Sequence, residues 1–307
     1  MHILVIGAKG MLGQEFVRQL RDKDVVGWGR EDIDITNAAE VMQKIGDIKP
    51  GLIINCAAYN NVDKAENEPQ VAMAINGEAI GYLAAAALKC GAAFVHFSSD
   101  YVFSGELSAT QLDAAACNFV TIGYMEEDLP NPVSVYGQSK ALGENKIVSI
   151  PRGRAEWTQW YIVRTSRLFG LSGIGVTSKK SFPEMMLKFA REKGRIEAID
   201  AEVSSPTYVK DLAEATLKMV EGDAPSGIYH ISNSGSCTWY EYAKVTIECV
   251  GLQNVEVVPV GQEHFPRKAK RPAFSVLLNN KLPLLRPWQE ALREYLISKF
   301  ENGFLVE

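Results

Sequence analysis

The fold is decided by a stretch near the N-terminus, Ile3-Leu4-Val5-Ile6-Gly7-Ala8-Lys9-Gly10-Met11-Leu12-Gly13. Its first four residues are β-branched residues and a leucine, which is typical of a buried parallel strand. The first glycine permits a tight turn, the second lets the backbone approach a pyrophosphate, and the third lets the following helix pack on the strand. This strand–glycine–helix order predicts a dinucleotide-binding turn, with a glycine-rich turn that holds no ligand as the alternative.

Strands and helices alternate along the rest of the chain. Apolar runs predict strands at 25–28, 52–58, 94–97, 160–164 and 229–232, and helical spacing predicts helices near 37–46, 70–90, 134–149, 182–193, 209–221, 239–250 and 288–300. The alternation favours an α/β fold with a Rossmann-type doubly wound parallel sheet. The rhythm becomes irregular beyond about residue 165, which indicates a smaller C-terminal α/β domain. We expect residues 1–165 and roughly 208–232 to form the first domain, and residues 166–207 and 233–307 to form the second.

Composition and charge narrow the function classes. The 307 residues are 47% hydrophobic and 22% charged, which is ordinary for a soluble globular protein. A net charge of −5 gives no reason to expect a nucleic-acid partner. The first apolar run is too short for a signal peptide, and no window approaches the ~20 apolar residues of a membrane helix. We therefore expect a cytoplasmic protein without a membrane partner.

Cysteine and histidine are sparse and scattered. The five cysteines are odd in number, widely spaced and contain no Cys-x-x-Cys, which argues against a disulfide framework. The four histidines show no metal-ligand spacing, so no metal is expected. His96 stands in an apolar run and is expected to be a packed strand residue.

The end of the strand at 25–28 bears on the choice of dinucleotide. An acid at this position holds the ribose 2′-hydroxyl of NAD, whereas an arginine nearby accommodates the 2′-phosphate of NADP. Arg30 follows the strand closely and no acid precedes it, which favours NADP(H). Glu31 and Asp32 come next and keep NAD(H) open, and a solvated loop charge is the alternative for Arg30.

Tyr136 and Lys140 are the strongest catalytic candidates. They stand four residues apart, so on a helix they share one face. An ammonium beside a phenol lowers the tyrosine pKa and makes it usable as an acid or base near neutral pH. A chance pair on an amphipathic helix is the alternative. Ser99 and Asp100 follow the strand at 94–97, at the carboxyl edge where open α/β sheets bind their ligands.

Two further stretches suit a ligand. Small residues at the end of the strand at 52–58, among them Ala57 and Ala58, let a flat cofactor lie against backbone. The basic stretch 267–272 is either a solvated surface or a clamp for a charged ligand. Within it, Arg271 suits a phosphate best because a guanidinium presents a planar fork of donors.

The dinucleotide turn, a serine at a strand end and Tyr-x-x-x-Lys on a later helix together resemble the extended short-chain dehydrogenase/reductase family. Within it, the chain is similar to the dTDP-4-dehydrorhamnose reductases over nearly its whole length. The resemblance is carried by Asn55-Cys56-Ala57-Ala58-Tyr59, Val62-Asp63-Lys64-Ala65-Glu66-Asn67-Glu68-Pro69, Ser98-Ser99-Asp100-Tyr101-Val102-Phe103-Ser104-Gly105, Val135-Tyr136-Gly137-Gln138-Ser139-Lys140, Arg164-Thr165-Ser166, Ser205-Pro206-Thr207 and Arg271-Pro272.

The resemblance implies NADPH-dependent reduction of the C4 keto group of a nucleotide-linked 6-deoxy-4-keto sugar, with dTDP-4-dehydro-L-rhamnose giving dTDP-L-rhamnose and NADH as the alternative cofactor. Tyr136 is then the proton donor, Lys140 lowers its pKa and bonds the nicotinamide ribose, and Ser99 holds the keto oxygen. The implied cofactor residues are Gly7, Gly10, Met11 and Leu12 at the pyrophosphate, Asp34 on the adenine side, and Ala57, Ala58 and Tyr59 at the nicotinamide half. The glycine turn and the strand end add Gly13 and Arg30 to the expected cofactor site. We expect the substrate to be bound by Ser99, Asp100, Arg167 and Arg271.

Three departures from the family pattern lie on the substrate side. Arg167 stands where the family often has a tryptophan, and the stretch 200–204 lacks the usual Gln-x-Gly. The excursion between Gly105 and Tyr136 is longer than usual by roughly a dozen residues, which exceeds ordinary loop lengths. These departures leave undetermined which nucleotide and which sugar the substrate contains. A homodimer is possible, and the sequence does not decide the oligomeric state.

Two other functions remain as alternatives. A nucleotide-sugar dehydratase or epimerase has the same fold, but dehydratases that resemble this family carry a carboxylate where this chain has Tyr101. A non-catalytic NADP-binding subunit, similar to the regulatory beta subunit of methionine adenosyltransferase, would leave Ser99, Tyr136 and Lys140 idle.

Overall fold

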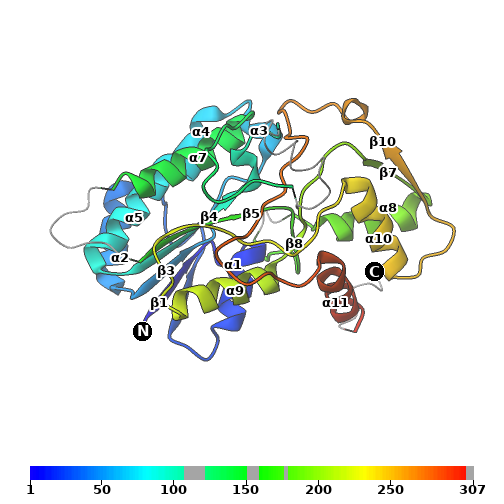
Figure 1. The fold of residues 1–307 in the computed structure, drawn as a ribbon. Coiled ribbons are helices and arrows are strands. Elements are labelled where there is room, and N and C mark those ends of the chain that lie inside the picture. The colour runs from blue at the N-terminus through cyan, green and yellow to red at the C-terminus, as the bar shows by residue number, and fades with distance from the viewer. Residues whose placement is uncertain (107–121, 151–158, 176–178, 302–307) are drawn as a thin grey trace.

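A six-stranded parallel sheet forms the centre of the protein (Figure 1). The computed structural model describes residues 1–106, 122–150, 159–175 and 179–301. The strands run in the order β2-β1-β3-β4-β5-β9. Their bounds are β1 Ile3–Ile6, β2 Val25–Trp28, β3 Leu52–Asn55, β4 Ala93–Ser99, β5 Trp160–Thr165 and β9 Gly227–His230. Strand order reverses between β1 and β3, so the dinucleotide turn after β1 lies at the switch point of the sheet.

Helices cover both faces of this sheet. On one face lie α2 (Ala38–Ile48), α5 (Ala79–Cys90) and α7 (Val135–Val148), and on the other α1 (Met11–Gln19) and α9 (Val209–Glu221) (Figure 1). Alternate residues of a strand point to opposite faces. Accordingly, Leu4 and Ile6 of β1 join the core under α2 and α5, whereas Ile3 and Val5 join the core under α1 and α9. The predicted doubly wound α/β fold is confirmed.

The C-terminal part adds two small parallel sheets and three helices. Its elements are β6 Leu168–Phe169 paired with β8 Thr207–Tyr208, β7 Arg195–Ile199 paired with β10 Glu256–Val260, and the helices α8 Phe182–Lys193, α10 Trp239–Cys249 and α11 Trp288–Glu301, with a 3-10 turn at Gln262–His264. Figure 1 shows β7, β10, α8, α10 and α11 gathered to the right of the large sheet. One hydrophobic core runs from the α1 side of that sheet into this part. The division into two domains stays a prediction.

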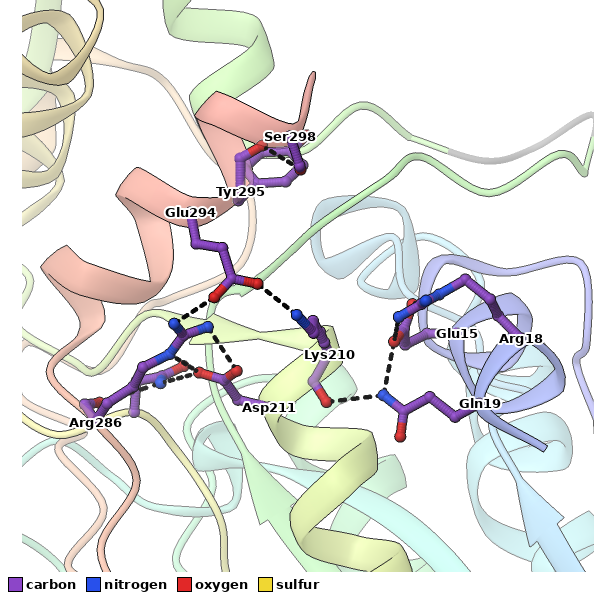
Figure 2. A network of polar contacts seen from close by, with 10 residues as sticks. Glu15, Arg18, Gln19, Lys210, Asp211, Arg286, Glu294, Tyr295 and Ser298 are labelled. Atoms are coloured by element: carbon purple, nitrogen blue, oxygen red, sulfur yellow. Dashed lines mark hydrogen bonds and ion pairs between the residues drawn. The ribbon is translucent and has the colours of Figure 1, made fainter. Parts of the chain in front are cut away.

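A polar network ties the helix after the glycine turn to the C-terminal helix (Figure 2). The Arg286 guanidinium donates to both carboxylate oxygens of Asp211 on α9, at 2.8 Å each, and to Glu294 of α11 at 2.5 Å. Lys210 Nζ also donates to Glu294, and its carbonyl oxygen accepts from Gln19 Nε2 on α1 at 3.0 Å. The network therefore holds α1, α9 and α11 together.

Sequence reasoning located the six strands of the large sheet but missed the strands of the small sheets, β6, β7, β8 and β10. Two of them have only two residues, which is too short for a periodic pattern. The helix predicted at 70–90 is divided into α4 (Pro69–Met73), a π-helical turn at Ala74–Glu78, and α5. A short helix α3 (Val62–Ala65) and a 3-10 turn at Asp100–Val102 complete the described elements. Residues 107–121 of the predicted excursion lie outside the described residues.

The helical run Pro69–Cys90 is long and apolar enough to qualify as a membrane span by length and composition, with a mean hydropathy of 1.5 in its most apolar window. The sequence expectation had excluded such a window. Half of this window is buried inside the protein, and α5 packs against α2 and α7. This is the environment of a core helix in an α/β fold.

A buried ion pair fixes α7 to the sheet. Arg164 of β5 donates two hydrogen bonds to the Glu144 carboxylate of α7, at 3.0 and 2.7 Å. Both side chains are almost fully buried, at 1% and 3% exposure. The Arg164 guanidinium also lies 5.0 Å from the centre of the Phe103 ring. A buried charge that loses its partner is costly, so each member of the pair depends on the other.

Replacing Arg164 with leucine leaves the Glu144 carboxylate buried without its counter-charge. We expect Arg164→Leu to lower the free energy of unfolding by about 3–5 kcal/mol. The double variant Arg164→Leu/Glu144→Leu removes both charges, so its free energy of unfolding should fall clearly less than that of Arg164→Leu. Urea denaturation of the wild type and the two variants measures these differences, and a single variant as stable as the wild type would contradict the role of the pair.

Candidate active site

The glycine turn is packed too closely for side chains. Gly7 has a φ of +78°, and a Cβ added there would lie 2.6 Å from the backbone nitrogen of Ala57, just after β3. A Cβ at Gly13 would overlap the carbonyl oxygen of Gly7. The turn therefore brings bare backbone from β1, β3 and α1 together at the switch point. Such a cradle fits the pyrophosphate of a dinucleotide.

The remaining predicted cofactor residues near the turn lie at the same edge of the sheet. Helix α1 starts at Met11 with Gly10 as its N-cap, and no side chain caps its first turn. Its first backbone amides, which include those of Met11 and Leu12, therefore have no partner within the helix and suit an anion. Ala57, Ala58 and Tyr59 follow β3 beside the Gly7 turn.

The two candidates on the adenosine side, Arg30 and Asp34, differ in their hydrogen bonds. Arg30 is exposed and has no hydrogen-bond or ion-pair partner among the residues that the structure describes. Asp34 accepts hydrogen bonds from the Thr36 backbone nitrogen and hydroxyl, at 2.9 and 2.6 Å. These bonds lower the pKa of Asp34. Asp34 therefore stabilises the turn that precedes α2, and Arg30 stays free for a ligand.

The structure brings Ser99 and Tyr136 together. Ser99 ends β4 and Tyr136 lies in the first turn of α7, and their side chains form a hydrogen bond. Ser99 Oγ donates to Asp100 Oδ1 at 2.9 Å and accepts from the backbone nitrogen of Tyr101 at 3.1 Å. The Tyr101 ring meets that of Tyr136 edge-on, with centroids 5.7 Å apart. Two hydroxyls thus converge at the carboxyl edge of the sheet, beside the glycine cradle.

The predicted lowering of the Tyr136 pKa is wrong. Tyr136 keeps some solvent exposure as a residue, but protein surrounds its hydroxyl, and this burial raises its pKa to about 12. The hydrogen bond with Ser99 opposes the shift only in part, and the nearby Asp100 charge adds to it. The ammonium of Lys140 does not offset the burial, because its Nζ donates to the carbonyl oxygen of Phe97 at 2.5 Å. Tyr136 is therefore a protonated phenol at neutral pH.

Lys140 is a buried cation. Only 2% of the residue is exposed, and this burial lowers the pKa of Lys140 to about 8. The carboxylate of Glu144, one helical turn further along α7, partly restores the charged form. His96 on the neighbouring strand is buried as expected and bonds to Asn55 at 3.1 Å through Nδ1. Burial and the charge of Lys140 keep the pKa of His96 well below its ordinary value.

Asp100 and Arg167 lie at the same edge of the sheet, and the positive charge of Arg167 favours the ionised form of Asp100. Asp100 accepts from Ser99 and, through Oδ2, from Ser275 Oγ at 2.6 Å, and burial raises its pKa to about 6. Arg167 adopts a φ of +43°, which is uncommon for a residue with a side chain. Its guanidinium donates to the carbonyl oxygens of Cys237 and Glu202 at 2.7 Å each and stacks on the Trp239 ring at 4.0 Å.

The guanidinium donors of Arg271 are already bonded to other protein groups. Its guanidinium donates to both carboxylate oxygens of Asp63, at 3.1 and 2.7 Å, and to the carbonyl oxygen of Ala269. The interaction lowers the pKa of Asp63. Asp63 lies on α3, so the fork joins the basic stretch to the first part of the chain. A phosphate contact by Arg271 stays a prediction, and it requires the ligand to compete with Asp63.

Sequence reasoning missed Asn76, which lies in the π-helical turn. Its Nδ2 donates to the Tyr59 carbonyl oxygen and to Ser139 Oγ, both at 3.0 Å, and its Oδ1 accepts from the Tyr59 backbone nitrogen at 2.8 Å. Ser139 Oγ in turn donates to the carbonyl oxygen of Tyr136 at 2.7 Å. Asn76 thus links the loop after β3 to α7. The available signal was the single asparagine within a stretch predicted as an alanine-rich helix. The structure places this residue in a π-helical turn, and such turns are frequent at functional sites.

Metal-ligating side chains are dispersed within the described part of the chain. No group of three or more histidine, cysteine or acidic side chains there could hold a metal ion. Four cysteines, namely Cys56, Cys90, Cys237 and Cys249, are free thiols. Cys117 lies outside the described residues.

The sequence model of the family described as RmlD substrate binding domain matches residues 1–300. The chain is 38% identical to the spore coat polysaccharide biosynthesis protein SpsK of Bacillus subtilis (strain 168) over 300 residues, which covers 96% of each chain. It is 34% identical to the dTDP-4-dehydrorhamnose reductase of Streptomyces griseus over 302 residues, covering 95% of this chain and 91% of the relative.

Two solved structures share the whole fold. A dTDP-4-dehydrorhamnose reductase from Clostridium acetobutylicum superimposes with a TM-score of 0.85 and 35% identity, covering 97% of this chain and 99% of the other. The dTDP-4-dehydrorhamnose reductase of Bacillus anthracis, solved in complex with NADP, gives the same TM-score and coverage at 32% identity.

The burial of Lys140 predicts a pH dependence of stability. Its folded-state pKa of about 8 lies below the value of 10.5 for an unburied lysine, so the unfolded chain binds more protons between these values. The free energy of unfolding should therefore rise with pH in this window, relative to Lys140→Met, by on the order of 3 kcal/mol. Denaturation of both proteins from pH 7 to pH 10.5 measures the difference, and a difference independent of pH would contradict the shifted pKa.

Proposed function

The chain belongs to the RmlD substrate binding domain family, and from this premise we propose that it reduces the C4 keto group of a nucleotide-linked 6-deoxy-4-keto sugar with NADPH. The substrate that we propose is dTDP-4-dehydro-L-rhamnose, and the product is dTDP-L-rhamnose. Relatives that are named dTDP-4-dehydrorhamnose reductase, at 32–34% identity over nearly the whole chain, support this choice. The observation that carries the proposal is the pair of hydroxyls of Ser99 and Tyr136 beside the glycine cradle.

The proposed cofactor site follows from the cradle. The backbone at Gly7, Gly10 and Gly13, with the first amides of α1, would hold the pyrophosphate. The loop that contains Ala57, Ala58 and Tyr59 would hold the nicotinamide half. The reduced nicotinamide, when bound, supplies a hydride to C4 of the sugar. A relative solved in complex with NADP supports the choice of coenzyme.

Tyr136 and Ser99 act on the keto oxygen. As C4 gains a hydride, the carbonyl π bond breaks and its electron pair moves onto oxygen, which becomes an alkoxide. The Ser99 hydroxyl holds this oxygen and stabilises the developing charge. Tyr136 donates its hydroxyl proton to the oxygen, which completes the alcohol. An alkoxide is a far stronger base than a phenolate, so a phenol with a pKa of about 12 still transfers its proton.

The state of Tyr136 suits reduction better than elimination. A reductase needs the phenol protonated before the hydride arrives, and burial of its hydroxyl provides this state at neutral pH. Elimination of water instead needs a carboxylate next to Asp100, and this chain has Tyr101 there. Burial raises the pKa of Tyr101, so it offers no base at neutral pH.

A cytoplasmic location, the absence of membrane and nucleic-acid partners, and a homodimer stay predictions.

The direct test is a panel of nucleotide-linked 6-deoxy-4-keto sugars that differ in nucleotide and sugar. Purified protein is mixed with NADPH and each sugar, and coenzyme oxidation is followed together with product mass. We expect one NADPH consumed per alcohol formed, fastest with the dTDP-linked 4-keto-L-sugar. Loss of water from the sugar without coenzyme oxidation would identify a dehydratase, and no conversion of any sugar would overturn the proposal.

Tyr136→Phe removes the proton donor and keeps the ring. We expect turnover to fall by about two orders of magnitude or more, the scale of general-acid catalysis, while NADPH binding is nearly unchanged. Steady-state kinetics and calorimetry measure the two effects. Tyr240→Phe on α10 is the matched control and should retain full turnover. If Tyr136→Phe kept the turnover of the wild type, Tyr136 would not be the acid.

A further inference from the structure

A chain of hydrogen bonds connects Tyr136 to Ser275, which lies in the C-terminal part of the protein. Ser99 forms a hydrogen bond with Tyr136 and donates to Asp100 Oδ1 at 2.9 Å. Ser275 Oγ donates to the other carboxylate oxygen of Asp100, Oδ2, at 2.6 Å. Ser99, Asp100 and Ser275 are all buried. The reaction proposed above makes no use of Ser275.

The hydrogen-bonding capacity of the Ser99 hydroxyl is fully used within the protein. A serine hydroxyl carries one hydrogen and two lone pairs. The hydrogen goes to Asp100, and one lone pair accepts from the Tyr101 backbone nitrogen at 3.1 Å. The protonated Tyr136 hydroxyl donates to the other lone pair. Ser99 can therefore donate to a keto oxygen only when it withdraws its hydrogen from Asp100.

This withdrawal takes a donor from a buried carboxylate. A buried charged group that loses a hydrogen bond costs free energy, so Asp100 resists the change. Ser99 and Ser275 both favour the ionised form of Asp100 through their hydroxyls. Once Ser99 turns away, Ser275 is the side-chain donor that remains on Asp100 among the residues that the structure describes.

Ser275 is held in place by backbone bonds on both sides of its segment. Its backbone nitrogen donates to the Val203 carbonyl oxygen at 2.8 Å. The carbonyl oxygen of the next residue, Val276, accepts from the Tyr124 backbone nitrogen at 2.8 Å. Neither bond involves Ser99 or Tyr136, so the Ser275 hydroxyl keeps its position when those two side chains turn to a substrate.

We propose that Ser275 is a positioning residue, which holds the Asp100 carboxylate and thereby frees the Ser99 hydrogen for the keto oxygen of the substrate. The Tyr136 hydrogen then turns from Ser99 to the same oxygen. The inference rests on the proposed function and deepens it, since it concerns how two hydroxyls that bond to each other within the protein both become donors to the sugar.

The charge state of Asp100 decides when Ser275 matters. Above its pKa of about 6, Asp100 is a carboxylate and competes for the Ser99 hydrogen. Below this pKa it is a protonated carboxyl, which can itself donate to Ser99 Oγ and no longer needs that hydrogen. The bond from Ser275 lowers the pKa of Asp100, so its loss raises this pKa. Loss of Ser275 should therefore impair the reaction at high pH and have little effect at low pH.

The other groups that face Asp100 do not change charge between pH 5.5 and pH 8.5. Arg167 stays cationic, because a guanidinium does not lose its proton in this range. Tyr101 and Tyr136 stay neutral, because burial raises the pKa of both phenols. Lys140, with a pKa of about 8, titrates in the wild type and in a Ser275 variant alike, so its effect cancels in the ratio of their rates.

The test measures kcat of the full chain with NADPH and the preferred sugar of the panel at both pH values. For Ser275→Ala we expect kcat to fall about tenfold at pH 8.5, the scale of one hydrogen bond to a charged group. At pH 5.5 the ratio of wild type to variant should approach one. NADPH binding, measured by calorimetry, should be unchanged. A merely structural role of Ser275 would lower kcat equally at both pH values.

Two further variants complete the test. Ser275→Cys keeps the size of the side chain and offers only a weak S–H donor, so it should show the same pH pattern with a smaller loss. It serves as the test variant if Ser275→Ala does not fold. The matched control is Ser298→Ala, which removes a hydroxyl that donates to the Tyr295 carbonyl oxygen at 2.8 Å on α11. It should keep full turnover at both pH values.

If the folded Ser275 variants kept the wild-type kcat at pH 8.5, or lost it equally at both pH values, the inference alone would be overturned. The reaction of the wild type would still stand in that case. A wild type that reduces no sugar of the panel would instead overturn the proposed function, and this inference with it.

Discussion

The ion pair between Arg164 and Glu144 is the interaction on which the candidate site depends. It is buried between β5 and α7, and it holds the helix that carries Tyr136 against the sheet. On the same helix, Lys140 bonds the Phe97 carbonyl oxygen of β4. Gly137 approaches Tyr101 so closely that a Cβ would overlap the Tyr101 carbonyl oxygen. These contacts leave the Tyr136 hydroxyl against Ser99, at the edge of the sheet that also carries the glycine turn.

Burial that assembles the site also sets its protonation states. Removing the Tyr136 hydroxyl from water disfavours the phenolate, and removing the Lys140 ammonium from water disfavours the cation. The phenol is consequently an acid in its resting state, which is the form that reduction of a ketone consumes. The carboxylate of Glu144 then has two tasks, because it neutralises Arg164 and favours the charged form of Lys140. Packing thus sets the charge states on which the proposed reduction depends.

Local sequence patterns predicted the parts of the site but not their electrostatics. The glycine turn, Ser99 and the Tyr136–Lys140 spacing were readable because each is a short motif at the end or start of a predicted element. The direction of the Tyr136 pKa was not, since it depends on the balance between desolvation and the distance to Lys140. The partner of Arg271 is Asp63, 208 residues away in the chain, and no local pattern connects them. Asn76 and the two-residue strands were not predicted for a similar reason, because tertiary contacts define them.

The central claim is that Tyr136 protonates a keto oxygen held by Ser99 while a hydride reaches the carbon that bears it. The most direct measurement is the fate of deuterium from NADPH that carries two deuterium atoms at C4 of its nicotinamide ring, followed by NMR and mass spectrometry of the sugar product. The account predicts one deuterium bound to C4 of the sugar and an oxygen at C4 that carries a hydrogen from solvent-exchangeable groups. Deuterium at another carbon, or a product that has lost water and carries no deuterium, would contradict it.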